Sequence, residues 1–375
     1  MYIYEYKDWP NFTWDNTSLL TQLGRVRHLQ GKLTGKMEAL DFKLKKEATL
    51  KTLTLDILKT SEIEGENLNH DQVRSSIARH LRMDISGLIK SDRNIDGIVE
   101  MMLDATQKFQ SPITTKRLFD WHRSLFPLTK HQPKIIIGNW RNDKTGPMQV
   151  VSGGMGREKI HYQAPPASKL KSEIEKFLKW FNGNDELDPV LKAGIAHLWF
   201  LTLHPFEDGN GRIARAIADM QLSRADGNNQ RFYSMSAQIR LIRNKYYSML
   251  EKTQRNKPTI TEWLKWFLDC LENALKATTT ILERVLSKAK FWEKHIQTTL
   301  NDRQKKMINK LFDACPDDPF GRDFEGKLSS SKWAKMTKCS PDTALRDIQD
   351  LMDKKILKKE KAGGRSTNYE LVVKI

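Results

Sequence analysis

Hydrophobic residues recur at helical spacing along most of the chain, and this pattern predicts a mainly helical protein. Between residues 15 and 109 the apolar positions form successive stripes separated by short polar segments. A further stripe begins near Leu118, and the run from Pro189 to Leu203 is typical of an apolar helix. Pro205 fixes the end of that helix, because proline lacks an N–H and restricts the residue before it. Residues 261–290 predict a pair of long amphipathic helices.

Two stretches depart from the helical pattern. Tyr2, Tyr4 and Tyr6 alternate with other residues, and this period of two predicts a short strand. Residues 134–166 begin with β-branched positions and contain several glycines, so we expect an irregular β-hairpin flanked by loops.

The last part of the chain, from Asn301, predicts a separate module. Helices are expected after Asp302, Ser329 and Ser340, and apolar residues near Leu357 and Tyr369 indicate a hairpin around a Gly-Gly turn. Three helices followed by a hairpin are typical of a winged helix-turn-helix module. The expected fold is therefore mainly α, with a helical core, a β-hairpin flap and a C-terminal winged helix-turn-helix domain.

Composition and charge narrow the class of protein only slightly. At 375 residues the chain has room for two or three domains, and it contains no apolar run near 18 residues that would predict a membrane span. Three widely spaced cysteines indicate neither a disulfide framework nor a zinc site, and the N-terminus lacks a secretion signal. We therefore expect a cytoplasmic protein. The net charge of +17 suits ATP, acidic proteins and nucleic acid alike.

The candidate chemistry lies in the run from His204 to Arg215, which reads HPFEDGNGRIAR. A Gly-Asn-Gly segment before a helix leaves backbone N–H groups free for an anion, and Arg212 and Arg215 can both reach a bound phosphate from the first turn. His204 can take a proton near neutral pH. Asp208 is a hard oxygen ligand suited to Mg²⁺ shared with phosphates. These residue types together point to phosphoryl or nucleotidyl transfer.

The same run resembles the signature of the Fic family, His-Pro-Phe-x-(Asp/Glu)-Gly-Asn-(Gly/Lys)-Arg-x-x-Arg, at every fixed position. The resemblance implies AMP transfer from ATP to a Ser, Thr or Tyr hydroxyl of a protein substrate. It makes His204 the catalytic base and Asp208 the ligand of Mg²⁺. It also implies a nucleotide site that comprises Gly209, Asn210, Gly211, Arg212, Arg215, Asn244, Tyr246 and Tyr247.

A second resemblance concerns the end of an expected helix over residues 48–64. Thr60, Glu64 and Gly65 match the inhibitory pattern of the family, (Ser/Thr)-x-x-x-Glu-(Gly/Asn). This resemblance puts Glu64 in an ion pair with Arg215, in space that the γ-phosphate needs. An ordinary capped helix end with surface acids would explain the same residues, since Gly65 suits the position after a helix.

The remaining expectations follow from the same family. The hairpin resembles a flap that aligns the protein substrate by strand addition, with a pairing edge at Pro147, Met148, Gln149 and Val150. We expect an N-terminal helical domain at 1–110, a Fic catalytic core at 111–295 and the winged-helix module at 296–375.

Two other functions are consistent with the same residues. A de-AMPylating hydrolase could use Glu64 to position water, and a nucleotide-sensing regulator could bind DNA through the C-terminal module. The helix after Ser340 carries Arg346 and Gln349 among several aspartates, which would repel DNA phosphates. This favours contact with a protein or with a second copy of the chain in a homodimer, while Arg365 on the wing keeps DNA as an alternative partner.

Overall fold

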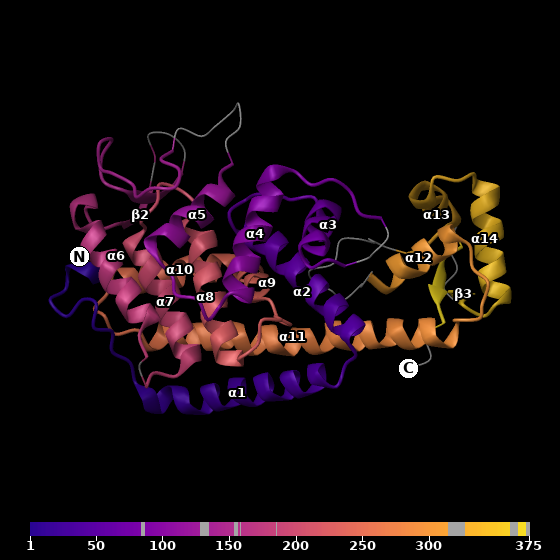
Figure 1. Cartoon of the computed structure of the whole chain (residues 1–375), viewed down its shortest axis with the longest axis horizontal. Coiled ribbons are helices and arrows are strands. Elements are labelled where there is room, and N and C mark those ends of the chain that lie inside the picture. Colours follow the sequence, from indigo (N-terminus) through magenta and orange to yellow (C-terminus); the bar gives the residue numbers. More distant parts are fainter. Residues whose placement is uncertain are drawn as a thin grey trace. The chain divides into compact units, whose positions relative to one another are not determined.

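The computed structural model describes residues 1–83, 87–127, 135–153, 157, 159–184, 186–313, 327–360 and 367–372. It divides into two compact units, residues 1–279 and 280–375 (Figure 1). The predicted mainly helical fold is confirmed, and the described strands form two small hairpins. The finer domain boundaries at residues 110 and 295 stay predictions. The Gly-Gly turn at 363–364 and Arg365 lie outside the described residues.

The first unit opens with helices, as the sequence pattern predicts, but the second helix begins at Phe42, earlier than the expected start at residue 48. Asp15 caps the first long helix by accepting a hydrogen bond from the Ser18 N–H, and Asp41 caps the second in the same way. Glu64 ends the second helix, and Gly65 follows in the left-handed conformation (φ +88°) that its position after a helix predicts. The helices of this part are α1 (Asn16–Glu38), α2 (Phe42–Ile63), α3 (His70–His80) and α4 (Arg93–Gln107).

The strand predicted for Tyr2 to Tyr6 is wrong. The structure has a short 3₁₀ helix, η1 (Ile3–Glu5), in which the Glu5 side chain accepts a hydrogen bond from the Tyr2 N–H. The tyrosines alternate for another reason: the rings of Tyr2 and Tyr4 both contact the edge of Tyr162. A strand needs a neighbour for its backbone groups, whereas this turn satisfies them locally.

The predicted hairpin follows α5 (Thr115–Leu125) and consists of β1 (Gln149–Ser152) and β2 (Lys159–Gln163). The strands are antiparallel, and their register shifts between Val150 and Val151. Val150 pairs with Tyr162 and Val151 with Ile160, so His161 is the extra residue of a β-bulge. Helix α6 (Ala167–Asn182) follows the hairpin.

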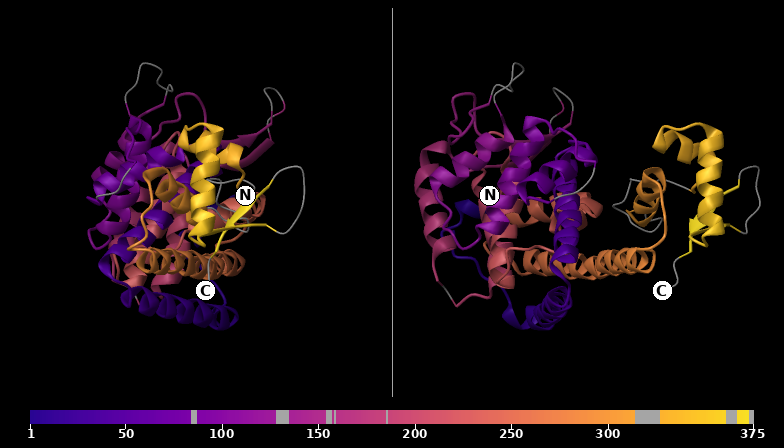
Figure 2. Two further views of the ribbon diagram at one scale, coloured as in Figure 1. Left: turned by 90° about the vertical axis from the view of Figure 1, so that its right-hand side faces the viewer. Right: turned by 45° about the vertical axis from the view of Figure 1, so that its right-hand side comes forward.

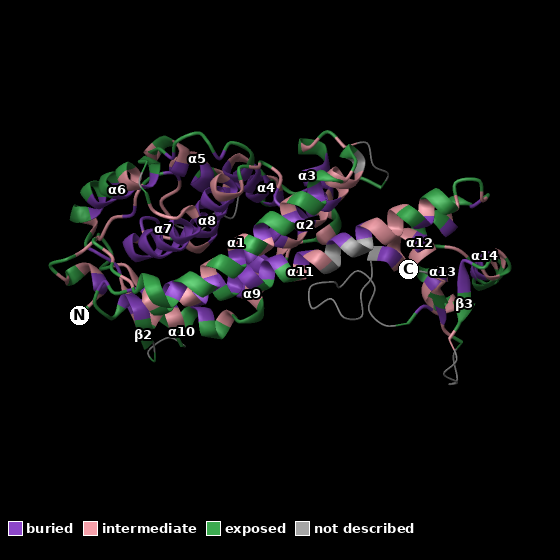
Figure 3. Cartoon of the chain, turned by 90° about the horizontal axis from the view of Figure 1, so that it is seen from below, coloured by how far each residue is buried: buried purple, intermediate pink, exposed green. Residues whose placement is uncertain are grey.

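Two adjacent helices form the centre of the first unit. These are α7 (Pro189–Leu203) and α8 (Asn210–Asp226), and α7 is buried on all sides (Figure 3). A helix that is apolar all round belongs in a core, so the run from Pro189 to Leu203 folds as its sequence predicts. The loop between these helices carries the Fic-like run, and its geometry is therefore fixed by the best-packed part of the unit.

The first unit continues with α9 (Met235–Leu241) and α10 (Arg243–Gln254), and helix α11 (Thr261–Lys294) begins in the first unit and ends in the second. The pair of helices predicted for 261–290 is wrong, because α11 is one continuous helix. No glycine or proline interrupts residues 261–294, so nothing in the sequence ends the helix. Side chains of α1 bond this helix: Gln22 donates to the Lys265 carbonyl, and Arg25 pairs with Glu272.

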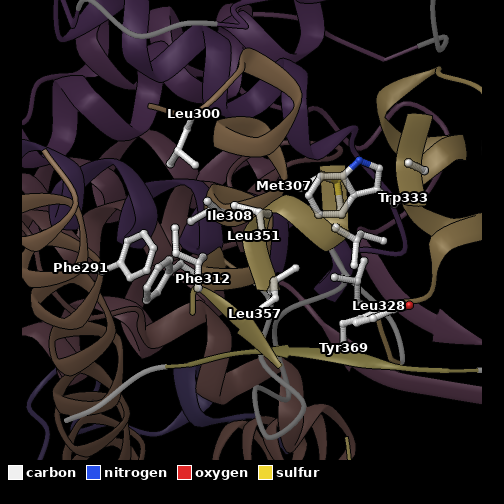
Figure 4. Packing of buried hydrophobic residues seen from close by; sticks show 13 residues of the cluster. Phe291, Leu300, Met307, Ile308, Phe312, Leu328, Trp333, Leu351, Leu357 and Tyr369 are labelled. Atoms are coloured by element: carbon white, nitrogen blue, oxygen red, sulfur yellow. The ribbon is translucent and has the colours of Figure 1, made fainter. Parts of the chain in front are cut away.

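The second unit has its own core. Its described elements are α12 (Asp302–Asp313), α13 (Ser330–Thr337), α14 (Pro341–Asp353), β3 (Leu357–Lys359) and β4 (Tyr369–Leu371) (Figure 2). Ser329 and Ser340 cap α13 and α14, as the sequence predicts. Trp333, Ile348 and Leu351 are fully buried in a cluster that also includes Phe291 and Leu300 (Figure 4).

Among the described residues, no helix is both long enough and apolar enough to span a bilayer. The cytoplasmic location stays a prediction.

Candidate active site

The loop between α7 and α8 places His204 at the end of one helix and Asn210 at the start of the next. His204 adopts the left-handed conformation (φ +47°), which turns the chain away from α7. Its Nδ1 lies 3.3 Å from the Leu201 carbonyl oxygen, which can only accept, so the neutral ring carries its proton on Nδ1. The Nε2 lone pair is then the proton acceptor that a general base requires.

The environment of His204 keeps its imidazole neutral. Burial, with a smaller contribution from Arg141, lowers its pKa from 6.5 to about 4, although the Leu201 carbonyl and the charges of Glu64 and Asp208 act in the opposite direction. At neutral pH the ring is therefore uncharged, with Nε2 unprotonated. A base in this state can accept a proton without first losing one.

Internal hydrogen bonds hold the loop in one shape. Asn210 donates to the Phe206 carbonyl (2.7 Å) and accepts from the Phe206 N–H (3.0 Å), so its side chain closes the turn. His122, fully buried on α5, takes a hydrogen bond from the Gly138 N–H at Nδ1 and therefore donates from Nε2 to the Asp208 carbonyl (3.2 Å). Its ring also stacks on Phe206. Asn210 is predicted as a phosphate contact, and the structure gives it a bracing role in addition.

Arg141 fixes the backbone at the base itself. Its Nε donates to the His204 carbonyl (2.7 Å), its Nη2 donates to the Pro165 carbonyl (2.6 Å), and its own N–H donates to the Pro205 carbonyl (3.0 Å). Arg141 thus connects the loop between α7 and α8 with the segment that leaves the flap. Sequence reasoning missed Arg141 and His122, because neither belongs to the motif nor to a recognisable pattern of its own.

Arg215 on α8 is almost wholly buried (2% of its side chain exposed) and is held by the end of α2. Its Nε donates to Thr60 Oγ1 (2.6 Å), and its Nη2 donates to the Thr60 carbonyl (3.0 Å) and to Glu64 Oε1 (2.6 Å). The predicted ion pair between Glu64 and Arg215 is therefore confirmed. Thr60, the first residue of the inhibitory pattern, orients the same guanidinium.

Arg212 is held in a similar way by an acid that the sequence analysis did not single out. Its side chain is 3% exposed, and its Nη1 lies 3.0 and 3.1 Å from the two carboxylate oxygens of Glu66. Glu66 itself is 45% exposed. Glu66 lies two residues after Glu64 in the sequence, and this proximity is the feature from which its contact with the site could have been predicted. Both arginines of the motif thus pair with acids from one short segment.

The N-terminus of α8 has the features of an anion site. A Cβ on Gly211 would lie 2.2 Å from Glu64 Oε1, so the glycine lets this carboxylate approach the helix start. Among the described residues, Arg215 Nη1 and Arg212 Nε are buried donors with no hydrogen-bond partner. Buried donors without partners call for an explanation, and a phosphate at the helix N-terminus would supply their acceptors.

The charge of Glu64 is maintained by the surrounding cations. Burial raises its pKa, and Arg215, followed by Arg212 and Arg243, lowers it more, so the net pKa lies below the ordinary value. Glu64 is thus an anion at neutral pH. Its carboxylate occupies space beside the same guanidinium that a phosphate oxygen would contact.

Asp208 fits the predicted role of a magnesium ligand only together with a substrate. Within the described part of the chain, no cluster of three or more His, Cys, Asp or Glu side chains could hold a metal. Asp208 is a single exposed carboxylate whose Oδ1 accepts from the Gly209 N–H (2.6 Å). Mg²⁺ commonly takes one or two carboxylates and completes its shell with water and phosphate oxygens. The single carboxylate of Asp208 is consistent with this way of binding Mg²⁺.

Three residues of the predicted nucleotide site lie on α10, and their surroundings differ. Asn244 is exposed, whereas Tyr246 is buried and its hydroxyl bonds His197 Nε2 (2.9 Å). The Tyr247 hydroxyl lies 3.3 Å from the Ile63 carbonyl, to which Arg243 also donates (2.7 Å). The first turns of α10 therefore contact the end of α2. Contact of these residues with a nucleotide stays a prediction.

The predicted flap edge coincides with the start of β1. Pro147 and Met148 precede the strand, and the Met148 carbonyl accepts from the Ala164 N–H (2.9 Å). Gln149 and Val150 belong to β1 and pair with β2 through one edge. Among the described residues, the opposite edge of β1 pairs with no other strand.

Comparisons with known proteins agree with this geometry. Residues 112–222 match the model of the Fic/DOC family, and residues 2–83 match a domain of unknown function, DUF4172. A protein named protein adenylyltransferase Fic from Drosophila yakuba is 27% identical over 216 residues, and its namesake from Drosophila ananassae is 26% identical over 222. These alignments cover 57% and 58% of this chain, but only 39% and 40% of the relatives. The chain thus spans about two fifths of their length.

Solved structures share the fold. A Fic family protein from Desulfovibrio desulfuricans matches with a TM-score of 0.52 at 18% identity, over 96% of this chain and 97% of that one. A Fic domain containing signaling protein from Bacteroides thetaiotaomicron matches with a TM-score of 0.50 at 18% identity, over 69% and 97%. The fold is shared with Fic family proteins, and the loop between α7 and α8 lies within the residues that match the family model. The chain carries a domain of the Fic/DOC family at residues 112–222.

Proposed function

We propose that the chain is a protein adenylyltransferase that transfers AMP from ATP to a Ser, Thr or Tyr hydroxyl of a protein substrate and is autoinhibited by Glu64. The observation that carries the proposal is a neutral histidine beside a helix N-terminus with two buried arginines. The names of the Drosophila relatives support the reaction type.

In the proposed reaction, His204 Nε2 accepts the proton of the substrate hydroxyl. The oxygen attacks the α-phosphorus of ATP, the bond from this phosphorus to the α,β-bridging oxygen breaks, and pyrophosphate leaves with that electron pair. The backbone N–H groups at the start of α8 receive the negative charge on the α-phosphate. Arg212 and Arg215 receive the β- and γ-phosphates, which satisfies their unpartnered donors.

Asp208 is the residue that would hold Mg²⁺ with the phosphates. The ion supplies charge neutralisation on the phosphate oxygens when it is bound. Asp208 itself keeps its orientation through the Gly209 N–H.

The proposed inhibition follows from competition for Arg215. While Glu64 pairs with this guanidinium, a γ-phosphate must displace the carboxylate or bind elsewhere. Two anions beside one cation repel each other, and a displaced γ-phosphate would misalign the α-phosphate for attack. Glu64 thus sets the fraction of bound ATP that can react.

The direct test incubates the full chain with α-³²P-ATP, Mg²⁺ and cell lysate, followed by mass spectrometry of labelled proteins. Glu64→Gly should raise AMP transfer, because glycine empties the space and is well tolerated after a helix end. His204→Ala, added to Glu64→Gly, should lower transfer by roughly 10²–10⁴-fold while ATP binding persists.

Because the pKa of His204 is about 4, transfer should persist below pH 6 and fall only as the ring protonates.

Two outcomes would contradict the proposal. A folded Glu64→Gly chain that transfers no more AMP than the parent overturns the inhibition, and no labelled protein at all overturns the transferase. Loss of AMP removal from a modified substrate in Glu64→Gly would assign the chain to the hydrolase class, with Glu64 as the residue that positions water.

For the second unit we propose a winged-helix module that contacts protein. Its helices and hairpin are consistent with that class. Asp347 is buried and pairs with Arg303 (2.7 Å), and Asp350 pairs with Lys354 (2.5 Å), so these two acids oppose DNA less than the sequence indicates. Asp342 and Asp353 remain exposed beside Arg346 and Gln349 on α14. Contact with a second copy of the chain would make the protein a homodimer.

A further inference from the structure

Four side chains gather at the bulge in the flap, those of Ser152, His161, Glu251 and Arg255. The His161 ring lies 2.7 Å from Glu251 Oε2 through Nδ1 and 2.5 Å from Ser152 Oγ through Nε2. The backbone carbonyls of His161 and Ile160 both accept from Arg255, at 3.0 Å from Nε and 2.7 Å from Nη2. Glu251 belongs to the last turn of α10, and Arg255 is the residue that ends this helix. The end of α10 therefore holds β2 by both side chain and backbone.

The bulge explains why this contact exists. His161 has no partner residue on β1, because the register passes from Tyr162 directly to Ile160. A bulge disrupts the ladder and bends its strand unless something fixes it. Arg255 supplies hydrogen-bond donors at this point, and its position is set in turn by Glu251 (3.4 Å) and by the Tyr2 ring.

The bulge also decides which side chains the flap presents. Residues 160 and 162 would face the same side of a regular strand, since side chains alternate with a period of two. Here Tyr162 is buried (2% exposed) against Tyr2 and Tyr4, whereas Ile160 is 41% exposed. Ile160 pairs with Val151, which is also exposed, so the bulge creates an apolar pair at the surface of the flap.

We propose that Arg255 is a positioning residue for the protein substrate: with Glu251, it holds the bulge at His161 so that the free edge of β1 and the Val151–Ile160 pair are presented in one orientation. The inference rests on the proposed function, because it assigns the acceptor side of the same reaction. The matching substrate segment is an extended chain with a hydrophobic residue that covers this pair, since strand addition combines backbone hydrogen bonds with side-chain contacts.

The test uses the full chain with Glu64→Gly and compares Arg255→Ala with Lys252→Ala. Lys252 is an exposed cation of the same helix, so its removal changes the charge equally. The acceptor is the most strongly labelled lysate protein, purified. We expect Arg255→Ala to raise the KM for this acceptor roughly 3- to 10-fold, as expected when hydrogen bonds from a charged group are lost, with the KM for ATP unchanged. The acceptor KM of Arg255→Lys should lie between those of the parent and Arg255→Ala, because an ammonium lacks the planar fork that spans two carbonyls.

Amide hydrogen exchange provides the second measurement. Residues 149–152 and 159–163 should exchange faster in Arg255→Ala than in Lys252→Ala, while α7 and α8 stay protected. An unchanged acceptor KM together with unchanged flap exchange overturns the inference while the transferase stands. A rise in the KM for ATP, or faster exchange in α7 and α8, assigns Arg255 a general structural role and also overturns it. If the Glu64→Gly chain labels no protein, the proposed function fails, and this inference fails with it.

Discussion

At the scale of single residues, the site is organised by two cations that lie out of water. Burying an unpaired guanidinium is strongly unfavourable, so Arg212 and Arg215 need anions in every state of the protein. In this structure Glu66 and Glu64 supply them. We infer that phosphate groups exchange with these carboxylates when ATP binds, and that each acid therefore opposes nucleotide binding according to the strength of its own ion pair.

If each acid opposes nucleotide binding according to the strength of its ion pair, then removing the charge of Glu66 alone should have a measurable effect on ATP binding. Glu66→Gln keeps the size of the side chain and removes its charge, so it should tighten ATP binding. Because Glu66 is 45% exposed and its ion pair is accessible to solvent, the gain should be about two- to fivefold. Calorimetry on the full chain would measure it, with Asp71→Asn, which removes an exposed acid of α3, as the matched control. ATP binding that weakens in Glu66→Gln would show that Glu66 helps to hold Arg212 for the nucleotide.

The same residues show what a sequence can and cannot reveal. His204, Asp208 and the two arginines lie in one run, and the backbone of a helix start makes their grouping predictable. The contact of Arg141 with the His204 carbonyl joins residues 63 positions apart, and the contact of His122 with the Asp208 carbonyl spans 86. No local pattern predicts such pairs, since packing of α5 and the flap against the loop creates them.

At the scale of secondary structure, α10 contacts both the end of α2, which carries Glu64, and the flap. Its first turns contact the end of α2 through Arg243 and Tyr247, and its last turn contacts the flap through Glu251 and Arg255. The helical pattern predicts the existence of this helix. Its contacts depend on how far the end of α2 lies from the flap in space, because α10 is long enough to reach both. The hydrophobic periodicity of the sequence does not encode this distance. The errors at η1 and α11 have different origins. At η1 the alternating tyrosines reflect ring contacts with Tyr162 and not strand pairing. At α11 the sequence contains no residue that would end the helix, so one continuous helix was the better interpretation.

The contact between α10 and α2 predicts a milder form of activation. Arg243 donates to the Ile63 carbonyl, one residue before Glu64, and so fixes the helix end that carries Glu64, the proposed inhibitory residue. Arg243→Ala should loosen this end and raise AMP transfer, by less than Glu64→Gly because the Glu64–Arg215 pair remains. Transfer to the labelled acceptor would be compared with Lys245→Ala, an exposed cation two residues further along α10. A decrease that Glu64→Gly does not reverse would indicate that Arg243 contacts the nucleotide instead.

At the scale of the whole chain, the described residues of the candidate site all belong to the first unit. Glu64, the loop, the flap and α10 lie within residues 1–279. The second unit builds a separate hydrophobic core that begins at Phe291 and includes Trp333 and Tyr369. A hydrophobic core of its own is the physical mark of a domain, and it is the reason that the sequence indicated a distinct C-terminal module.

This separation predicts that the chemistry does not need the second unit. A chain that ends at Lys290 omits the whole second core, whereas an end at Leu300 would leave Phe291 and Leu300 exposed to water. In the Glu64→Gly background, residues 1–290 should therefore transfer AMP to the acceptor with the same kcat and the same KM for ATP as the full chain. Thermal unfolding of the shortened protein would show whether the first unit remains folded, and size-exclusion chromatography of both proteins would report any dimer.

If the shortened chain is folded and monomeric but inactive while the full chain is an active dimer, the second unit supports the site through a second copy. If only the KM for the acceptor rises, the second unit binds the protein substrate, which would give its exposed α14 face a partner.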